Sequence, residues 1–212
     1  IYGFGGATAP DQPVGAISVL LVLLCVTILL ALIGAAGVSF GLAIVRRWST
    51  DLLALTGGGA AGGLLVGAVT KLLGLDAFRL LVGQSPGDIT GALEGVILGA
   101  AVGVAAWFSD RIRSMKRAAG VAALAGAAGG LAITLAGGRL MAGSLALLAA
   151  NVPQSRLRLD QFGRLAGEAG LGPIAQTALT AMEAALFAAC IIAALRLARP
   201  TANREVDAQP DR

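Results

Sequence analysis

Long runs without a charged residue constrain the fold of this chain more than any other feature. Residues 14–45 contain no charge over 32 positions, residues 52–70 none over 19, and residues 118–138 none over 21. Two further runs, 87–108 and 171–195, each carry one glutamate in their interior. Because about 20 apolar residues in a helix cross the hydrocarbon core of a bilayer, these runs predict five transmembrane helices in an all-α integral membrane protein.

Composition and charge agree with that fold class. The chain is 57% hydrophobic and 13% charged, with a mean hydropathy of +0.83, which excludes ordinary soluble domains and disorder. The net charge is +4, but the bases stand in short segments between the apolar runs. We therefore expect the lipid bilayer as a partner and no binding of nucleic acid.

The distribution of bases predicts an orientation. Bases follow the first run at Arg46 and Arg47, fill residues 110–117, and follow the last run, and cytoplasmic ends are rich in such residues. We expect an extracytoplasmic segment over 1–13, a first helix over 14–47, and a cytoplasmic polar tail over 197–212. Arginine outnumbers lysine 14 to 2, and alanine and glycine are abundant, which favours a GC-rich bacterial genome and the inner membrane.

An internal repeat follows the first helix. The hexapeptide GAAGGL occurs at 59–64 and again at 126–131, an offset of 67, and each copy lies in a run that ends near Lys71 or Arg139. Each unit closes with a run that bears one glutamate, and these glutamates are 89 apart. We predict two tandem hairpins over 51–108 and 118–196 forming a parallel repeat. An extracytoplasmic loop at 151–173 accounts for the 22 additional residues, the difference between 89 and 67.

Glycine recurs at every fourth position in several of these runs. Each glycine costs about 1 kcal/mol relative to alanine in a helix interior, and close approach of two helices in lipid offsets that cost. We predict a glycine zipper, with the packing interface formed by Gly59, Gly63, Gly67, Gly87, Gly91, Gly95, Gly99, Gly103, Gly126 and Gly130. Five glycines in one helix exceed the need of a single partner helix, so other membrane subunits or a homo-oligomer are expected to cover part of that surface.

Glu94 and Glu183 are the candidate functional residues, because a carboxylate inside the membrane is costly and usually faces protein or water. Three interpretations remain open. The glutamates form buried polar contacts with a backbone carbonyl or with Thr90 or Thr180, they line a proton or cation path, or they pair with a base of another subunit. Lys71 and Arg139 are expected to reach the lipid headgroups.

No catalytic, metal-binding or cofactor motif is recognisable. The chain has no histidine, and the G-x-S-x-G pattern at 37–41 lies in a helical run instead of a strand-to-helix turn. We expect no enzyme, and the first hypothesis is a non-catalytic membrane subunit or scaffold. The second is a proton- or cation-conducting channel or transporter using Glu94 and Glu183. The third is a membrane module of a longer or processed protein, since the chain begins at Ile1.

Overall fold

The computed structural model describes residues 13–82, 91–140, 143, 167–168 and 172–207, and most of these residues lie in helices. The helices are α2 (Pro13–Val45), α3 (Leu52–Val82), α4 (Ala92–Ser109), α5 (Met115–Leu135) and α8 (Pro173–Asp207). Each contains a stretch long and apolar enough to cross a membrane, which confirms the prediction of five such helices in an all-helical chain.

Two helices extend further than their apolar runs. Helix α3 continues past Lys71, near which its charge-free run ends, to Val82. Helix α8 continues to Asp207, into the segment 197–212 that was expected to be a polar tail. Both extensions begin in sequences rich in Leu, Ala, Lys and Arg, which favour helix whether or not they lie in lipid.

Local chemistry explains where helices α4 and α5 begin and end. Gly91 is in an extended conformation and is the N-cap of α4, which begins at Ala92. Gly137, with φ of +77°, follows the end of α5. The amide of Gly138 donates to the carbonyl of Ile133 at 2.9 Å, and that of Gly137 donates to Thr134 at 3.0 Å, a Schellman motif.

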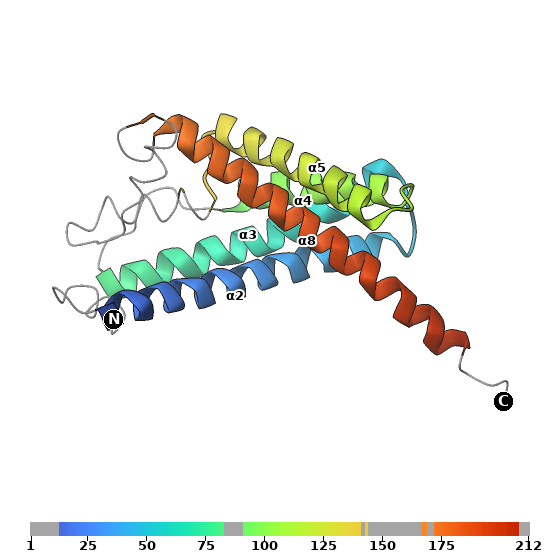
Figure 1. Ribbon diagram of the computed structural model, residues 1–212, viewed down its shortest axis with the longest axis horizontal. Helices are drawn as coiled ribbons and strands as arrows, with labels where there is room; N and C mark the ends of the chain where they lie inside the picture. The colour runs from blue at the N-terminus through green and yellow to red at the C-terminus, as the bar shows by residue number, and fades with distance from the viewer. Residues whose placement is uncertain (1–12, 83–90, 141–142, 144–166, 169–171, 208–212) are drawn as a thin grey trace.

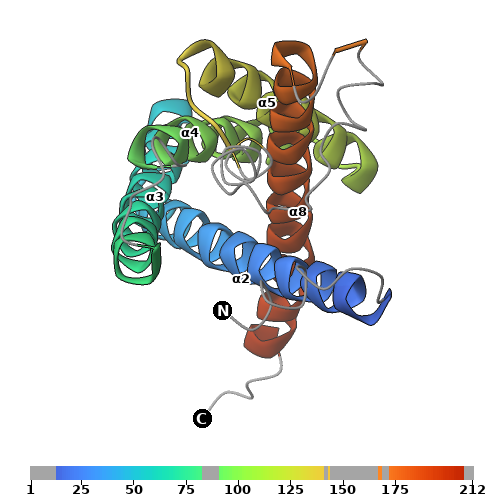
Figure 2. The same cartoon turned by 90° about the vertical axis from the view of Figure 1, so that its left-hand side faces the viewer.

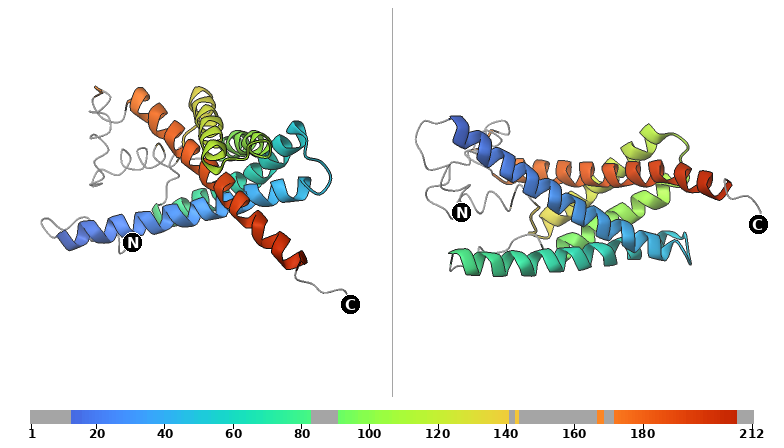
Figure 3. Two further views of the ribbon diagram at one scale, coloured as in Figure 1. Left: turned by 45° about the vertical axis from the view of Figure 1, so that its right-hand side comes forward. Right: turned by 90° about the horizontal axis from the view of Figure 1, so that it is seen from below.

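The helices are arranged as two hairpins with one additional helix. Helix α3 packs along α4, and α5 packs along α8; these are the two most extensive contacts in the described chain (Figure 1). Helix α4 also contacts α5 and so joins the hairpins, whereas α2 lies mainly on α3. The connection from α2 to α3 and that from α4 to α5 lie at the same end of the molecule, while α8 crosses α2 obliquely and projects beyond it (Figures 1, 2 and 3).

The larger core cluster lies where all five helices meet. Its centre is formed by fully buried Leu42, Leu55, Val102 and Ile192, which come from α2, α3, α4 and α8. A smaller cluster around Ile133 joins α5 to α8 and to the apolar side chains of α4. Helix α2 contributes to the larger cluster through Val38 and Leu42 of its second half.

Candidate functional site

Helices α3 and α4 approach each other at glycines that face in pairs. A Cβ atom built on Gly59 would fall against the carbonyl oxygen of Gly99, and one built on Gly99 would fall against that of Gly59. Gly63 and Gly95 face each other in the same reciprocal way. One turn further along, the backbone of Gly91 lies against Gly67.

This contact occupies the glycine stripe of α4 within the chain. Besides Gly91, Gly95 and Gly99, the remaining described glycine of the stripe, Gly103, meets the carbonyl oxygen of Leu55. The premise that the stripe exceeds the need of one partner helix is therefore wrong for these four positions, because α3 is 31 residues long and follows α4 along its length. Gly87 lies outside the described residues.

Helix α3 has a second glycine face that sequence reasoning missed. Gly58 and Gly62 each stand one position before a glycine of the face that meets α4, and they approach Gly41 and Gly37 of α2. A Cβ atom on Gly62 would fall against the carbonyl oxygen of Gly37. The doubled glycines at 58–59 and 62–63 were the signal, because neighbouring positions on a helix point about 100° apart and serve two different partners.

The second hairpin brings its helices together with glycine on one side only. Gly126 of α5 faces the carbonyl oxygen of Ala184, and Gly130 faces that of Thr180 at 2.7 Å from its Cβ position. In the first hairpin the positions 67 residues earlier, Gly59 and Gly63, face Gly99 and Gly95. The partner positions therefore differ by 184 minus 99, or 85, and not by the 89 that separates the glutamates.

That difference of four residues places the two glutamates one helical turn out of register. By the packing contacts, Glu94 corresponds to Leu179 and not to Glu183. The alignment of the repeats on their glutamates, and the surplus of 22 residues derived from it, therefore do not match the packing. The close approach is set by small side chains, and a carboxylate one turn away does not mark it.

Glu94 lies in the first turn of α4 and acts as its cap. Its Oε2 accepts a hydrogen bond from the amide of Gly91 at 2.9 Å, which satisfies one of the amides left free at a helix start. Its Oε1 lies 2.9 Å from the Cβ position of Gly138, so the half-buried side chain touches the turn after α5. Glu94 is thus the third residue of α4.

Glu183 occupies a different depth. It lies ten residues after Pro173, about 15 Å into α8, and is half-buried. Its neighbours on α8 pack against Gly126 and Gly130, whereas Glu94 reaches Gly138. Gly138 follows the end of α5, eight residues after Gly130, so the structure places the two glutamates at separate positions along the bundle.

The other candidate polar residues are two threonines and two bases. Thr180 is 1% exposed, and its hydroxyl has no hydrogen-bond partner within the described chain. Thr90 lies outside the described residues. Half-buried Lys71 covers the open face of Gly91, and half-buried Arg139 lies beside Gly143. Contact of these bases with headgroups stays a prediction.

A third carboxylate, which sequence reasoning missed, caps α8. Glu168 accepts hydrogen bonds from the amide of Ile174 at 3.0 Å and from that of Ala175 at 2.9 Å, one on each oxygen. Helix α8 begins at Pro173, which has no amide hydrogen to satisfy. The only signal was an acidic residue shortly before a Gly-Pro pair, five positions from the helix start.

The arrangement is that of a tightly packed bundle whose described carboxylates at this end cap helices. A negative charge at a helix N-terminus is stabilised by the helix dipole and by free amides, which accounts for Glu94 and Glu168 without a bound ligand. Comparisons with known proteins match no protein-family model, no curated protein and no solved structure.

Proposed function

We propose that this chain is a non-catalytic integral membrane subunit or scaffold that works within a larger membrane assembly. The observation that carries the proposal is the first part of α2. Between Leu21 and Ile33 this helix exposes large apolar side chains, whereas its second part packs on α3 through glycine. The exposed side chains are Leu21, Leu24, Ile28, Leu29, Leu32 and Ile33.

The length of α2 supports a role in contacts with other helices. Its 33 residues span about 50 Å, more than the hydrocarbon core of about 30 Å, so the helix must tilt or project from the bundle. In lipid, association gains from side-chain packing and not from the hydrophobic effect. The apolar side chains exposed between Leu21 and Ile33 offer this gain to another subunit or to a second copy.

We further propose the orientation with the N-terminus outside and the C-terminus in the cytoplasm of a bacterial inner membrane. Support comes from the gathering of basic segments at one end of the bundle. Arg46 forms an ion pair with Asp110 at 3.3 Å, and Arg196 donates hydrogen bonds to the carbonyls of residues 112–114. These contacts join the three segments that the distribution of bases assigned to the cytoplasm.

We also infer that the two hairpins form a glycine-zipper-packed parallel repeat. The inference is supported by the carbonyl contacts of Gly59 and Gly63 in one hairpin and of Gly126 and Gly130 in the other. The repeat then has a register of 85 for its second helices. The inserted loop of the second unit is correspondingly shorter by four residues than the glutamates suggested.

The test is the native mass of the protein, extracted in the mildest detergent that holds it, with every co-purifying chain identified. We expect a stoichiometric complex with other membrane chains or a defined homo-oligomer. The triple variant Leu24→Ala, Ile28→Ala and Leu32→Ala removes one exposed face of α2 and should release the partner. The matched control is Leu65→Ala, Val69→Ala and Leu72→Ala on an exposed face of α3, which should leave the complex intact.

Other outcomes would overturn the proposal. A monomer that remains folded, from wild type and variant alike, would contradict a subunit role. Proton or cation flux through liposomes containing the monomer, abolished by Glu183→Gln or Glu94→Gln, would support a transport function instead. A native polypeptide much longer than this chain would support a membrane module of a larger protein.

A further inference from the structure

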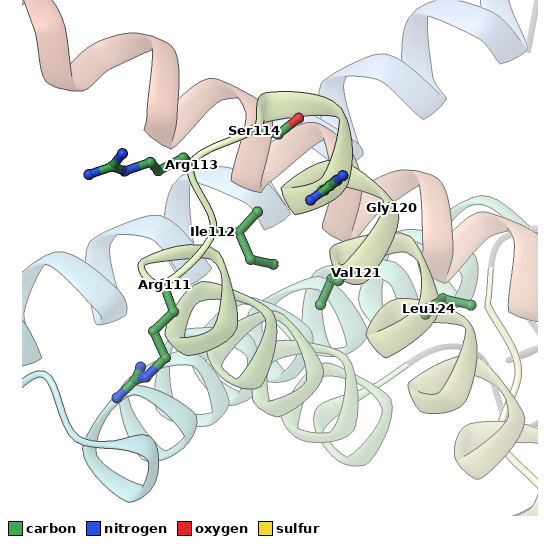
Figure 4. Close-up of a pocket in the computed structure, with 8 residues that line it drawn as sticks. Arg111, Ile112, Arg113, Ser114, Gly120, Val121 and Leu124 are labelled. Atoms are coloured by element: carbon green, nitrogen blue, oxygen red, sulfur yellow. The ribbon is translucent and has the colours of Figure 1, made fainter.

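The basic end of the bundle contains a hollow of about 810 Å³ between the α4–α5 connection and the first turns of α5 (Figure 4). Three arginines line it, Arg111, Arg113 and Arg117. The apolar side chains of Ile112, Val121 and Leu124 also line the hollow. In Figure 4, Ile112 and Val121 point toward one another, and Arg111 and Arg113 extend outward from the connection, so the hollow has an apolar floor and a basic rim.

The charge of this rim is not neutralised within the described chain. None of the lining residues is acidic, and the neighbouring Asp110 already pairs with Arg46. Arg113 and Arg117 are exposed and have no acidic partner among the described residues. Guanidinium groups without a carboxylate partner fit an anion, and they bind phosphate oxygens in a planar, bidentate geometry.

The position of the hollow fits the interface between water and lipid. Arg111 stacks on the ring of Trp107 at 3.6 Å from its centroid and donates to the carbonyl of Trp107 at 2.8 Å. Tryptophan is enriched at the headgroup level of membranes. The apolar wall continues along α5, where Leu124 is 73% exposed on a membrane-crossing helix.

The connection that forms the rim is held in place from the opposite side. Arg196 of α8 donates to the carbonyls of Ile112 at 2.6 Å, Arg113 at 3.0 Å and Ser114 at 3.5 Å. Arg46 and Arg196 thus bind groups of the connection itself, while Arg111, Arg113 and Arg117 line the hollow. The backbone of the connection is therefore ordered before a ligand binds.

We propose that this hollow binds the headgroup of an anionic phospholipid. The guanidinium groups of Arg113 and Arg117 bind the phosphate, Arg111 closes the rim beside Trp107, and an acyl chain lies along Val121 and Leu124. Basic pockets between helices on the cytoplasmic side of a membrane recognise anionic headgroups by this combination of charge and apolar wall. Free phosphate would bind the arginines of the rim but would make no contact with the apolar side chains.

The experiment is a lipid titration of the full chain. Delipidated protein in a neutral detergent is mixed with phosphatidylglycerol or with phosphatidylcholine of the same acyl chains, and bound lipids are counted by native mass spectrometry. We expect tighter binding of phosphatidylglycerol. Because each base near a membrane surface contributes roughly fivefold, Arg113→Gln with Arg117→Gln should weaken that binding by about 30-fold, and each single variant by about fivefold.

A control double variant removes two positive charges from the same end of the bundle. Arg47 and Lys116 are exposed and do not line the hollow, so Arg47→Gln with Lys116→Gln should weaken phosphatidylglycerol binding less than about threefold. The charge-conserving pair Arg113→Lys and Arg117→Lys should keep most of the affinity, and circular dichroism verifies that each variant is folded.

Three results would overturn the proposal. Equal affinity for the two lipids would contradict recognition of a negative headgroup. An equal loss in both double variants would indicate a diffuse effect of charge and no site. Displacement of phosphatidylglycerol by millimolar inorganic phosphate, with binding unaffected by Leu124→Gln, would indicate a site for free phosphate.

Discussion

The two hairpins reach the same close approach of their helices with different residues. In the first, glycine faces glycine from α3 to α4, and each member of a pair lies against the carbonyl of the other. In the second, glycine of α5 faces Thr180 and Ala184 of α8. The difference shows that glycine on one of two helices is sufficient for contact between their backbones. Glycine on both helices also removes the side chains that would otherwise lie between them.

The hairpins also begin their second helices differently. Helix α4 is capped from within its own first turn by Glu94, which satisfies one amide. Helix α8 is capped by Glu168, five positions before the helix, which satisfies two. The first cap belongs to the helix itself, whereas the second ties the helix to the chain that precedes it.

Alanine in the glycine pairs should break the first hairpin most strongly. A methyl group at Gly63 or Gly99 would fall on a backbone carbonyl that cannot rotate away, so we expect each substitution to lower the free energy of unfolding by about 2–3 kcal/mol. Gly57→Ala is the control, because no atom lies within 4 Å of its Cβ position and better helix propensity should add up to about 1 kcal/mol. Denaturant titration in micelles measures both, and equal effects would contradict the close packing.

The reverse substitution, alanine to glycine, should destabilise the second hairpin. Ala184 corresponds to Gly99 by its contacts and is fully buried beside Ile133 and Leu140. Ala184→Gly should cost about 2 kcal/mol, half from helix propensity and half from the lost methyl group. The same titration tests this value. A neutral or stabilising result would show that the second seam also favours glycine on both sides.

Removal of either cap should lower the free energy of unfolding by less than alanine in the glycine pairs does. The loss should be larger for the cap of the second hairpin than for that of the first. We expect Glu168→Ala to lower the free energy of unfolding by about 1–2 kcal/mol and Glu94→Ala by about 1 kcal/mol, because two amides lose their acceptor in one case and one in the other. Glutamine at either position keeps an acceptor oxygen and should cost less. A larger loss for Glu94→Gln than for Glu168→Ala would indicate a role for the Glu94 carboxylate beyond capping.

Thr180→Val should have the smallest effect. The buried hydroxyl of Thr180 has no partner in the described chain, and valine has almost the same shape, so we expect a change of less than about 1 kcal/mol, toward greater stability. Thermal unfolding of the two proteins in the same detergent is the measurement. A clear loss of stability would mean that this hydroxyl binds a group from another molecule or another segment.

Hydropathy alone predicted the five membrane-length helices, because solvation by lipid requires apolar side chains whatever the packing. The spacing of glycine predicted close approach, but only the structure showed that Gly58 and Gly62 face α2 while Gly59 and Gly63 face α4. Adjacent stripes on one helix cannot be assigned to partners from sequence, since the assignment depends on how each hairpin turns.

The site residues were harder to place than the helices. The role of Glu94 as a cap could not be placed from sequence, because the start of α4 depends on the cap at Gly91 and not on where the apolar run begins. The alignment on glutamates was one turn off because packing follows small residues. Glu168 was missed because its bonds to α8 depend on the path of the preceding loop, which carries no periodic pattern.

The hydrogen bonds of Arg196 have a consequence for how the chain could be divided. They attach the connection between the hairpins to α8, so the junction is held by non-covalent contacts as well as by the peptide chain. Two separately expressed fragments, divided after Ser114, would still share the α4–α5 contact and the hydrogen bonds of Arg196 to residues 112–114. We expect such fragments to reassemble in the membrane, which makes this connection a natural place to split the protein for reporter fusions.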